Sequence, residues 1–306
     1  MELNLCRYRF SFRVLEPMRF TDYTGSTLRG VFGHTLMDLS GISADKTLQS
    51  NYESFKNSVY VKVFEPCNDG DNSSRLNGNP IPYVLEASVQ GKSNYAKGDI
   101  YYFDMVLMND ATSYLAEVVL AWRRALLNGF GPKRSLARAE LILVQQHQID
   151  GSLKDLYSEH KPTLIPHRTM MQVPRFEGAQ DVELVFYTPL RLQHDGRVLK
   201  TEELNAAILL RNVLRRFSLC FPEHKPQDIN ELTDTAASVE DHKDLYAQDW
   251  KRYSNRQKQA MRLTGSVGRW VLKQVPEAWL PYVWVGQYLH VGKNTSFGLG
   301  AYRMID

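Results

Sequence analysis

Histidine is the side chain that most readily gives and takes a proton near neutral pH, because its ordinary pKa lies at about 6.5. Two of the histidines that lie close to glycines are the first candidates. His34 follows Gly30 and Gly33, and His290 comes just before Gly292. Either one can act as a general acid or base if a substrate reaches it, and either can instead order its own segment. The eight histidines are His34, His147, His160, His167, His194, His224, His242 and His290.

The segment that follows His290 carries a cation among glycines. Lys293 and Asn294 stand directly after Gly292. Backbone N–H groups of such a segment can converge on the oxygens of a phosphate, and the lysine would add its charge. A turn without a ligand is the alternative interpretation.

Two other stretches are basic. In the first half Lys133 and Arg134 follow Gly131, and Arg138 lies close by in the sequence. Residues 251–275 hold seven basic residues and no acidic one, which is typical of a surface that neutralises nucleic-acid phosphates. A solvated basic face without a ligand is the alternative. The seven are Lys251, Arg252, Arg256, Lys258, Arg262, Arg269 and Lys273.

Periodicity indicates the elements that would position these residues. Residues 7–14 alternate between apolar side chains and arginine or serine, which predicts a strand with one aromatic face. Apolar residues recur at helical spacing over residues 28–39, which predicts an amphipathic helix that Ser26 or Thr27 caps and Gly41 ends. His34 lies about 130° from the centre of the apolar stripe, so we expect it to point away from the core of its own domain.

The second half of the chain repeats this order of elements: strand, helix, further elements, a basic glycine-containing loop and a strand. Its long helix is expected to begin after Thr201, which can cap it. The remaining predicted elements are a helix over residues 113–127 and strands over residues 139–145, 182–187 and 301–305.

These elements predict an α+β protein with two domains. We expect an N-terminal domain over residues 1–150 and a C-terminal domain over residues 181–306. Residues 151–180 are polar and hold three prolines, which favours a link between the two.

Length and composition agree with a globular protein of two domains, since 43% of the 306 residues are hydrophobic and 23% are charged. No apolar run approaches the roughly 18–20 residues that span a bilayer, and the first residues lack the pattern of a signal peptide. We therefore expect a cytoplasmic protein. Cys6, Cys67 and Cys220 are too far apart to indicate a zinc site or a disulfide framework, so no metal site is expected.

Four stretches resemble, in the right order, the motifs of one protein family: the CRISPR repeat-RNA-processing endoribonucleases of the RAMP superfamily. They resemble its first helix, the extended segments that follow, its central C-terminal motif and its glycine-rich loop. The stretches are LRGVFGHTL at residues 28–36, YVKVFEP at 60–66 with PYVL at 82–85, RYSNRQ at 252–257 leading to Gly265, and HVGKNTSFGLGAY at 290–302.

The resemblance implies two tandem ferredoxin-like, RRM-like domains and a CRISPR repeat RNA as substrate. It implies cleavage without metal or cofactor, in which the 2′-hydroxyl attacks its own 3′ phosphate and leaves a 2′,3′-cyclic phosphate and a 5′-hydroxyl. Other CRISPR effector subunits are further partners that it suggests. A second interpretation is a non-catalytic RNA-binding subunit of the same superfamily. An unrelated RRM-like binder is a third, but residues 8–12 lack the glycines of its aromatic strand motif.

The family resemblance favours His34 as the catalytic histidine, because the histidine of the family commonly lies in or just after the first helix. Tyr23 could assist it or simply pack, and His290 is the second catalytic candidate or a residue that orders the glycine loop. Arg29 lies about 140° from His34 around the helix, which favours binding or an ion pair over catalysis. The expected RNA-binding residues are Arg29, Lys133, Arg134, Arg138, Arg252, Arg256, Lys258, Lys293 and Asn294.

Overall fold

The chain forms two compact units, one over Asn4–Met171 and the other over Met1–Leu3 with Gln172–Asp306. We call them the N-terminal and the C-terminal unit. The computed structural model describes residues 1–20, 24–42, 55–66, 80–87, 94–129, 136–254 and 259–305, with residues 251–254 and 259–261 described by their backbone alone.

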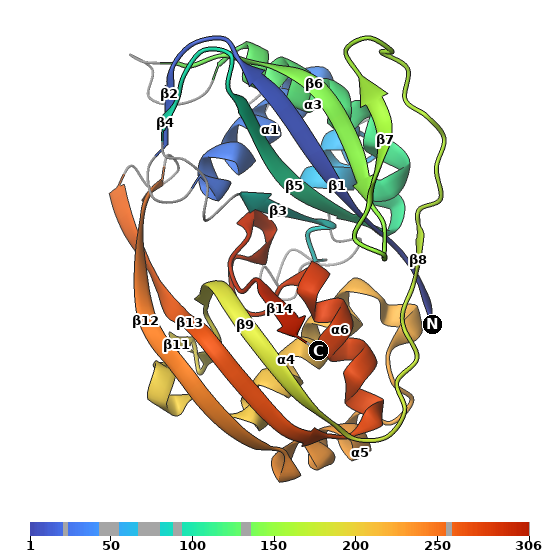
Figure 1. Cartoon of the computed structure of the whole chain (residues 1–306), viewed down its shortest axis with the longest axis vertical. Coiled ribbons are helices and arrows are strands. Elements are labelled where there is room, and N and C mark those ends of the chain that lie inside the picture. The colour runs from blue at the N-terminus through green and yellow to red at the C-terminus, as the bar shows by residue number, and fades with distance from the viewer. Residues whose placement is uncertain are drawn as a thin grey trace. The chain divides into compact units, whose positions relative to one another are not determined.

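The N-terminal unit runs strand, helix, strand, strand, helix, strand (Figure 1). Its sheet has the order β3-β5-β1-β6-β7, and β8 pairs with β1. Helix α1 follows β1, and α3 stands between β5 and β6. The elements are β1 (Glu2–Val14), β2 (Met18–Arg19), α1 (Gly25–Leu39), β3 (Tyr83–Ala87), β4 (Asn94–Tyr95), β5 (Ile100–Met108), α3 (Leu115–Leu127), β6 (Ala139–His147), β7 (Leu153–Ser158) and β8 (Met170–Gln172).

The C-terminal unit repeats this order, with α4 after its first strand and α6 before its last. Its sheet has the order β12-β13-β9-β14, which corresponds strand by strand to β3-β5-β1-β6 of the other unit. The prediction of two tandem ferredoxin-like α+β domains is therefore confirmed. The elements are β9 (Gln180–Leu190), β10 (Gln193–His194), β11 (Arg197–Val198), α4 (Ala206–Cys220), α5 (Ile229–Thr235), β12 (Glu240–Ser254), β13 (Gln259–Val275), α6 (Leu280–Leu289) and β14 (Tyr302–Ile305).

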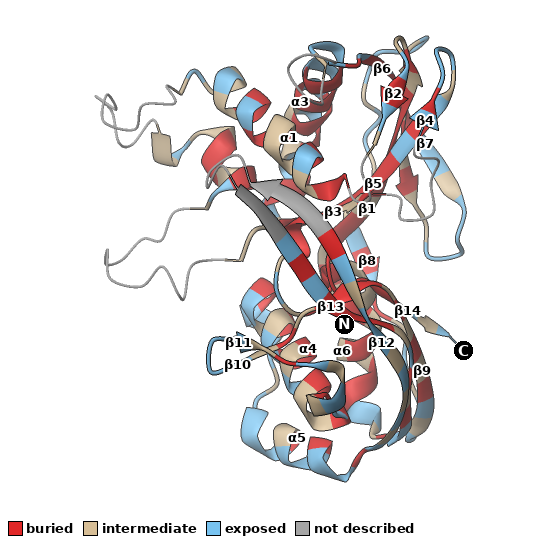
Figure 2. Cartoon of the chain, turned by 90° about the vertical axis from the view of Figure 1, so that its left-hand side faces the viewer, coloured by how far each residue is buried: buried red, intermediate tan, exposed pale blue. Residues whose placement is uncertain are grey.

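The aromatic face predicted for the first strand is the core of the N-terminal unit. Phe10 and Phe12 of β1 are fully buried and both stack on Phe103 of β5 at 5.6 Å between ring centroids. The indole of Trp122 on α3 stacks on Phe32 of α1, with centroids 4.7 Å apart and planes 9° from parallel. These rings hold both helices on one face of the sheet, and Figure 2 shows the buried residues of α3 in red.

Residues 60–66, expected to be extended, contain instead a π-helical turn over Tyr60–Phe64. The burial pattern gives the reason. Tyr60, Val63 and Phe64 are buried, and their spacing of i, i+3 and i+4 places them on one face of a helix. Apolar packing against α1 thus decides the conformation of this segment.

The stretch proposed as a link, residues 151–180, is divided between the two units. Leu153–Ser158 form β7, which pairs with β6 and buries Leu156 and Tyr157. The C-terminal unit begins again at Gln172. The polar composition of this stretch concealed these two buried side chains.

The long helix of the second half does not begin at Thr201. Thr201–Glu203 form a short 3-10 turn, and Asn205 caps α4 by accepting a hydrogen bond from the N–H of Ile208 at 2.9 Å. Asparagine immediately before the first helical residue is a stronger capping signal than a threonine several residues earlier.

Candidate functional site

His34 lies on the exposed side of α1. Leu28, Phe32 and Leu36 of this helix are fully buried, whereas the side chain of His34 is exposed. Asp38 follows it by one turn and is also exposed. Side chains four residues apart share one helix face, so a carboxylate stands near the imidazole on the solvent side. The arrangement presents a histidine that a substrate can reach.

The two glycines near His34, Gly30 and Gly33, have different surroundings. A Cβ atom added at Gly33 would lie 2.2 Å from Cζ of Phe64, whereas no atom of the described residues lies within 4 Å of the corresponding point at Gly30. Gly33 therefore makes room for an aromatic ring of its own unit. Gly30 leaves open space on the helix surface, where a backbone could approach.

Arg29 contributes to the packing beneath α1. Its guanidinium carbon lies 4.7 Å from the centroid of the Phe64 ring, a cation–π contact. Burial raises the pKa of the Tyr83 hydroxyl, and the nearby Arg29 guanidinium lowers it in part. The structure thus places Arg29 against aromatic rings of the N-terminal unit.

The glycine-rich loop of the C-terminal unit has several residues in the left-handed region. Asn294, Gly298 and Gly300 have φ values of 68°, 97° and 70°. A Cβ atom at Gly300 would lie 1.8 Å from the carbonyl oxygen of Val291, so only glycine fits there.

Most amide groups of this loop donate hydrogen bonds within the protein. Lys293 donates to the carbonyl of Arg191 at 2.9 Å, and Gly300 donates to that of Pro189 at 3.1 Å. The Thr188 hydroxyl donates to the carbonyl of Gly298 and accepts from the N–H of Ala301. Further N–H donors to backbone carbonyls are Val291, Phe297, Gly298 and Leu299. The loop is therefore a packed turn tied to the end of β9.

The loop buries its second half and exposes its lysine. Thr295 to Gly300 are buried, whereas the Lys293 side chain is exposed and Asn294 is half-buried. His290, at the end of α6, is only 1% exposed and has a positive φ of 56°. In this conformation Lys293 can contact a substrate, and the imidazole of His290 is enclosed by the protein.

Several basic residues of the sequence face carboxylates. In the C-terminal unit Arg269 contacts Glu183 at 2.6 Å and Lys273 contacts Asp181 at 2.7 Å. In the N-terminal unit Arg138 contacts Glu16 at 2.6 Å. The side chains of Tyr23, Lys133, Arg134, Arg252, Arg256 and Lys258 lie outside the described residues.

The arginines of β1 are also paired, on the face of the sheet opposite the helices. Arg7 contacts Glu86 at 2.6 Å, Arg9 contacts Asp104 at 2.8 Å, and Arg13 pairs with Glu159. Each arginine charge on this strand thus has a carboxylate beside it, so this face attracts phosphates weakly.

Asp104 is the centre of this network and is only 7% exposed. Besides Arg9, it contacts His147, whose Nε2 lies 3.2 Å from its carboxylate. Burial alone would raise the pKa of Asp104. The contacts with His147 and the arginines lower it by more than burial raises it, so the pKa lies well below its usual range.

Two features are absent from the described part of the chain: membrane-spanning helices and groups of metal ligands. Within it, no helix is long and apolar enough to cross a membrane. No three His, Cys, Asp or Glu side chains of those residues are grouped as metal ligands.

The two units match two family models. Residues 3–169 match AF_1859_N, described as an N-terminal domain, and cover more than half of the chain. Residues 184–302 match the model of the CRISPR-associated endoribonuclease Cas6. A comparison with curated proteins finds no match.

Solved structures share the fold at low sequence identity. The chain is similar to Thermus thermophilus Cas6 (TM-score 0.56, 12% identity, covering 100% of this chain and 99% of that one). The same Cas6 in a product complex gives a TM-score of 0.59 at 15% identity, with 98% and 100% covered. A partial Cas6-RT-Cas1--Cas2 complex gives 0.54 at 16% identity, covering 98% of this chain and 46% of that one.

The resemblance that the sequence motifs indicated is confirmed. It is supported by the two family models and agrees with the strand order of both units and with the glycine-rich loop. The chain belongs to the Cas6 family of CRISPR-associated endoribonucleases.

Proposed function

We propose that this protein cuts CRISPR repeat RNA without a metal ion, through attack of the 2′-hydroxyl on the adjacent 3′ phosphate. The 2′ oxygen forms a bond to phosphorus, its proton passes to a base, and the bond from phosphorus to the 5′ oxygen breaks. A proton returned to that oxygen completes the 5′-hydroxyl end, and the other end is a 2′,3′-cyclic phosphate. Membership of an RNA-cleaving family supports the reaction class.

The observation that carries the assignment is the exposure of His34 on α1, within the stretch that resembles the family's first helix. Its imidazole can take the proton of the 2′-hydroxyl or give one to the leaving oxygen, as histidine does in many acid–base reactions. Asp38 lies four residues further along the same helix face, a spacing from which a carboxylate can reach the imidazole and orient it.

RNA binding is assigned to exposed cations and to the glycine-rich loop. Lys293 presents its ammonium group from a turn whose backbone is fixed by hydrogen bonds to the end of β9. A lysine held in this way can contact a phosphate of the substrate. Arg252, Arg256 and Lys258 are proposed from the sequence as further cations that bind RNA phosphates.

The central test is the cleavage of repeat RNA by a His34→Ala variant. The rate should fall by about 10²–10⁴-fold, the usual contribution of one general acid or base. Folding and RNA affinity should change little, because the side chain is exposed. His160→Ala is the matched control: this histidine also belongs to the N-terminal unit, its side chain is 89% exposed, and it should cut at the parental rate.

A second substrate isolates the nucleophile. RNA with a 2′-deoxy sugar at the cut site should bind the parent and remain uncut. Equal rates for His34→Ala and the parent would remove His34 from the mechanism while leaving the function in place. A parent protein that binds its repeat RNA but never cuts it, in any buffer, would establish the non-catalytic binding subunit instead.

A further inference from the structure

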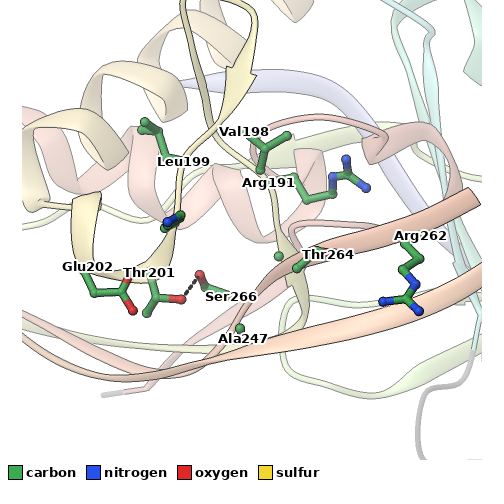
Figure 3. A pocket seen from close by; sticks show the side chains of 11 residues that line it. Arg191, Val198, Leu199, Thr201, Glu202, Ala247, Arg262, Thr264 and Ser266 are labelled. Atoms are coloured by element: carbon green, nitrogen blue, oxygen red, sulfur yellow. Dashed lines mark hydrogen bonds between the residues drawn. The ribbon is translucent and has the colours of Figure 1, made fainter.

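The C-terminal unit contains a pocket. Arg262 of the basic stretch 251–275 lines it, but none of the catalytic or RNA-binding residues expected from the family resemblance does. Its volume is about 380 Å³. One wall comes from the segment that leads from β11 towards α4, and the other from β13 with Ala247 of β12 (Figure 3). The lining side chains that matter here are those of Arg191, Lys200, Thr201, Glu202, Arg262 and Ser266.

Arg191 is the unusual member of this lining. Its Nε and Nη1 atoms are sealed from water and have no hydrogen-bond partner among the described residues. Burial lowers the pKa of its guanidinium, and no described carboxylate offsets that cost. Its backbone is fixed, because its carbonyl accepts the N–H of Lys293 and the residue itself forms an isolated β-bridge with Gly292. The described residues therefore leave this partly desolvated cation without a counter-ion.

The pocket has two chemically different ends. Figure 3 shows Arg191 and Arg262 towards one end, and Thr201, Ser266 and Glu202 towards the other. Arg262 is 76% exposed and contacts Asp249 only at 3.7 Å, so its guanidinium is largely available. At the other end the hydroxyls of Thr201 and Ser266 are hydrogen-bonded at 2.8 Å, and the Glu202 carboxylate can accept hydrogen bonds.

We propose that this pocket binds one nucleotide unit, with its phosphate at the arginine end and its ribose or base at the end of Thr201, Ser266 and Glu202. A phosphate supplies the acceptors that a guanidinium fork prefers. The polar far end offers hydrogen bonds that a bare phosphate would not use, and the volume falls in the range of sites for small organic ligands. The nucleotide can come from an RNA strand, in which case the inference rests on the proposed function, or from a free mononucleotide.

The first experiment measures the binding of each of the four nucleoside 5′-monophosphates to the whole protein by calorimetry. At least one should bind the parent, and Arg262→Gln should weaken it by about tenfold or more, since a hydrogen bond to a charged group is lost. Ala247→Trp should abolish binding by filling the pocket from an exposed position while keeping every charge. Arg269→Gln is the matched control, because Arg269 lies on the same strand, is exposed and faces one carboxylate, but does not line the pocket.

The second experiment identifies the source of the nucleotide. If an RNA strand fills the pocket, repeat RNA will displace the bound mononucleotide, and Ala247→Trp will weaken RNA affinity. Arg262→Gln should then reduce the logarithmic salt slope by roughly 0.7, the loss of one single-strand phosphate contact. If RNA and the mononucleotide bind together, the site serves a free nucleotide.

The proposal is overturned if no mononucleotide binds at millimolar concentration and Ala247→Trp binds RNA as the parent does. Circular dichroism spectra of both pocket variants establish that they are folded. Cleavage by saturating parent protein is measured separately, so failure of the pocket leaves the proposed cleavage standing. If the parent cuts no RNA but binds a mononucleotide in the pocket, the pocket proposal stands and the proposed cleavage fails.

Discussion

Gly30 and Gly33 lie about one turn apart on α1 and meet different surroundings, so the same substitution should have different effects on stability. Alanine is favoured over glycine inside a helix by about 0.8–1.0 kcal/mol. Gly30→Ala should gain this amount, because the added methyl group meets no atom of the described part of the chain within 4 Å. It should therefore raise the free energy of unfolding.

Gly33→Ala has the same gain in helix propensity and an additional cost. Its methyl group would lie 2.2 Å from the ring of Phe64, and that ring is enclosed by Phe32, Tyr60 and Tyr83. Overfilling a packed core usually costs about 1–3 kcal/mol. The propensity term is common to both variants and cancels, so Gly33→Ala should be less stable than Gly30→Ala by about 1–3 kcal/mol.

The assay is thermal or urea unfolding of both variants and the parent, observed through the tryptophans. At about 2–4 °C per kcal/mol for a unit of this size, the two midpoints should differ by about 2–12 °C. If Gly33→Ala unfolds at or above the midpoint of Gly30→Ala, the packing of the Phe64 ring does not require a glycine at position 33. A more stable Gly30→Ala that cuts RNA slowly would indicate that RNA passes close to that glycine.

The remaining predictions concern cleavage without a metal ion, RNA binding by Lys293, and the stability of the protein in acid. Cleavage should proceed in EDTA, and activity that is lost there and restored by magnesium would exclude the proposed mechanism. Lys293→Glu should weaken RNA binding and reduce the logarithmic salt slope by roughly 0.7, whereas an unchanged slope would place the RNA elsewhere. Asp104→Asn should destabilise the protein by about 1–3 kcal/mol in urea at neutral pH, because the half-buried side chains of Arg9 and His147 lose their carboxylate partner. Since the pKa of Asp104 is lowered in the folded protein, its contribution is complete above the unfolded value of about 3.9 and is lost as the pH falls below it, so the parent should be more acid-sensitive than the variant.

Regular periodicity explains why much of the fold could be predicted from the sequence. Residues 7–14 alternate strictly, and β1 buries the apolar set that the alternation selects. The second predicted helix, over residues 113–127, is confirmed by α3 at Leu115–Leu127, where Trp122 is fully buried. The π-helical turn at Tyr60–Phe64 could have been found from the same kind of spacing, but five residues are too few to separate a short helix from a strand.

Side-chain partners and pockets depend on pairings that sequence separation conceals. The arginines of β1 look available in the sequence, yet their carboxylates come from β3, β5 and the segment after β7. Arg191 and Arg262 are brought together because β13 pairs with β9, with Ser266 opposite Leu190. No local pattern indicates such a register, so the pocket could not be predicted from the sequence.

The hydrogen bonds of the glycine-rich loop have a consequence for the thermodynamics of RNA binding. A loop that folds around its ligand must give up backbone conformational entropy at that moment, about 1–2 kcal/mol for each residue that becomes ordered. The loop before β14 has its left-handed residues and most of its amide groups already fixed by the protein, so most of this cost is met when the chain folds. Contact with this loop should therefore add binding free energy with only a small ordering penalty, and the affinity it contributes depends on a correctly folded C-terminal sheet.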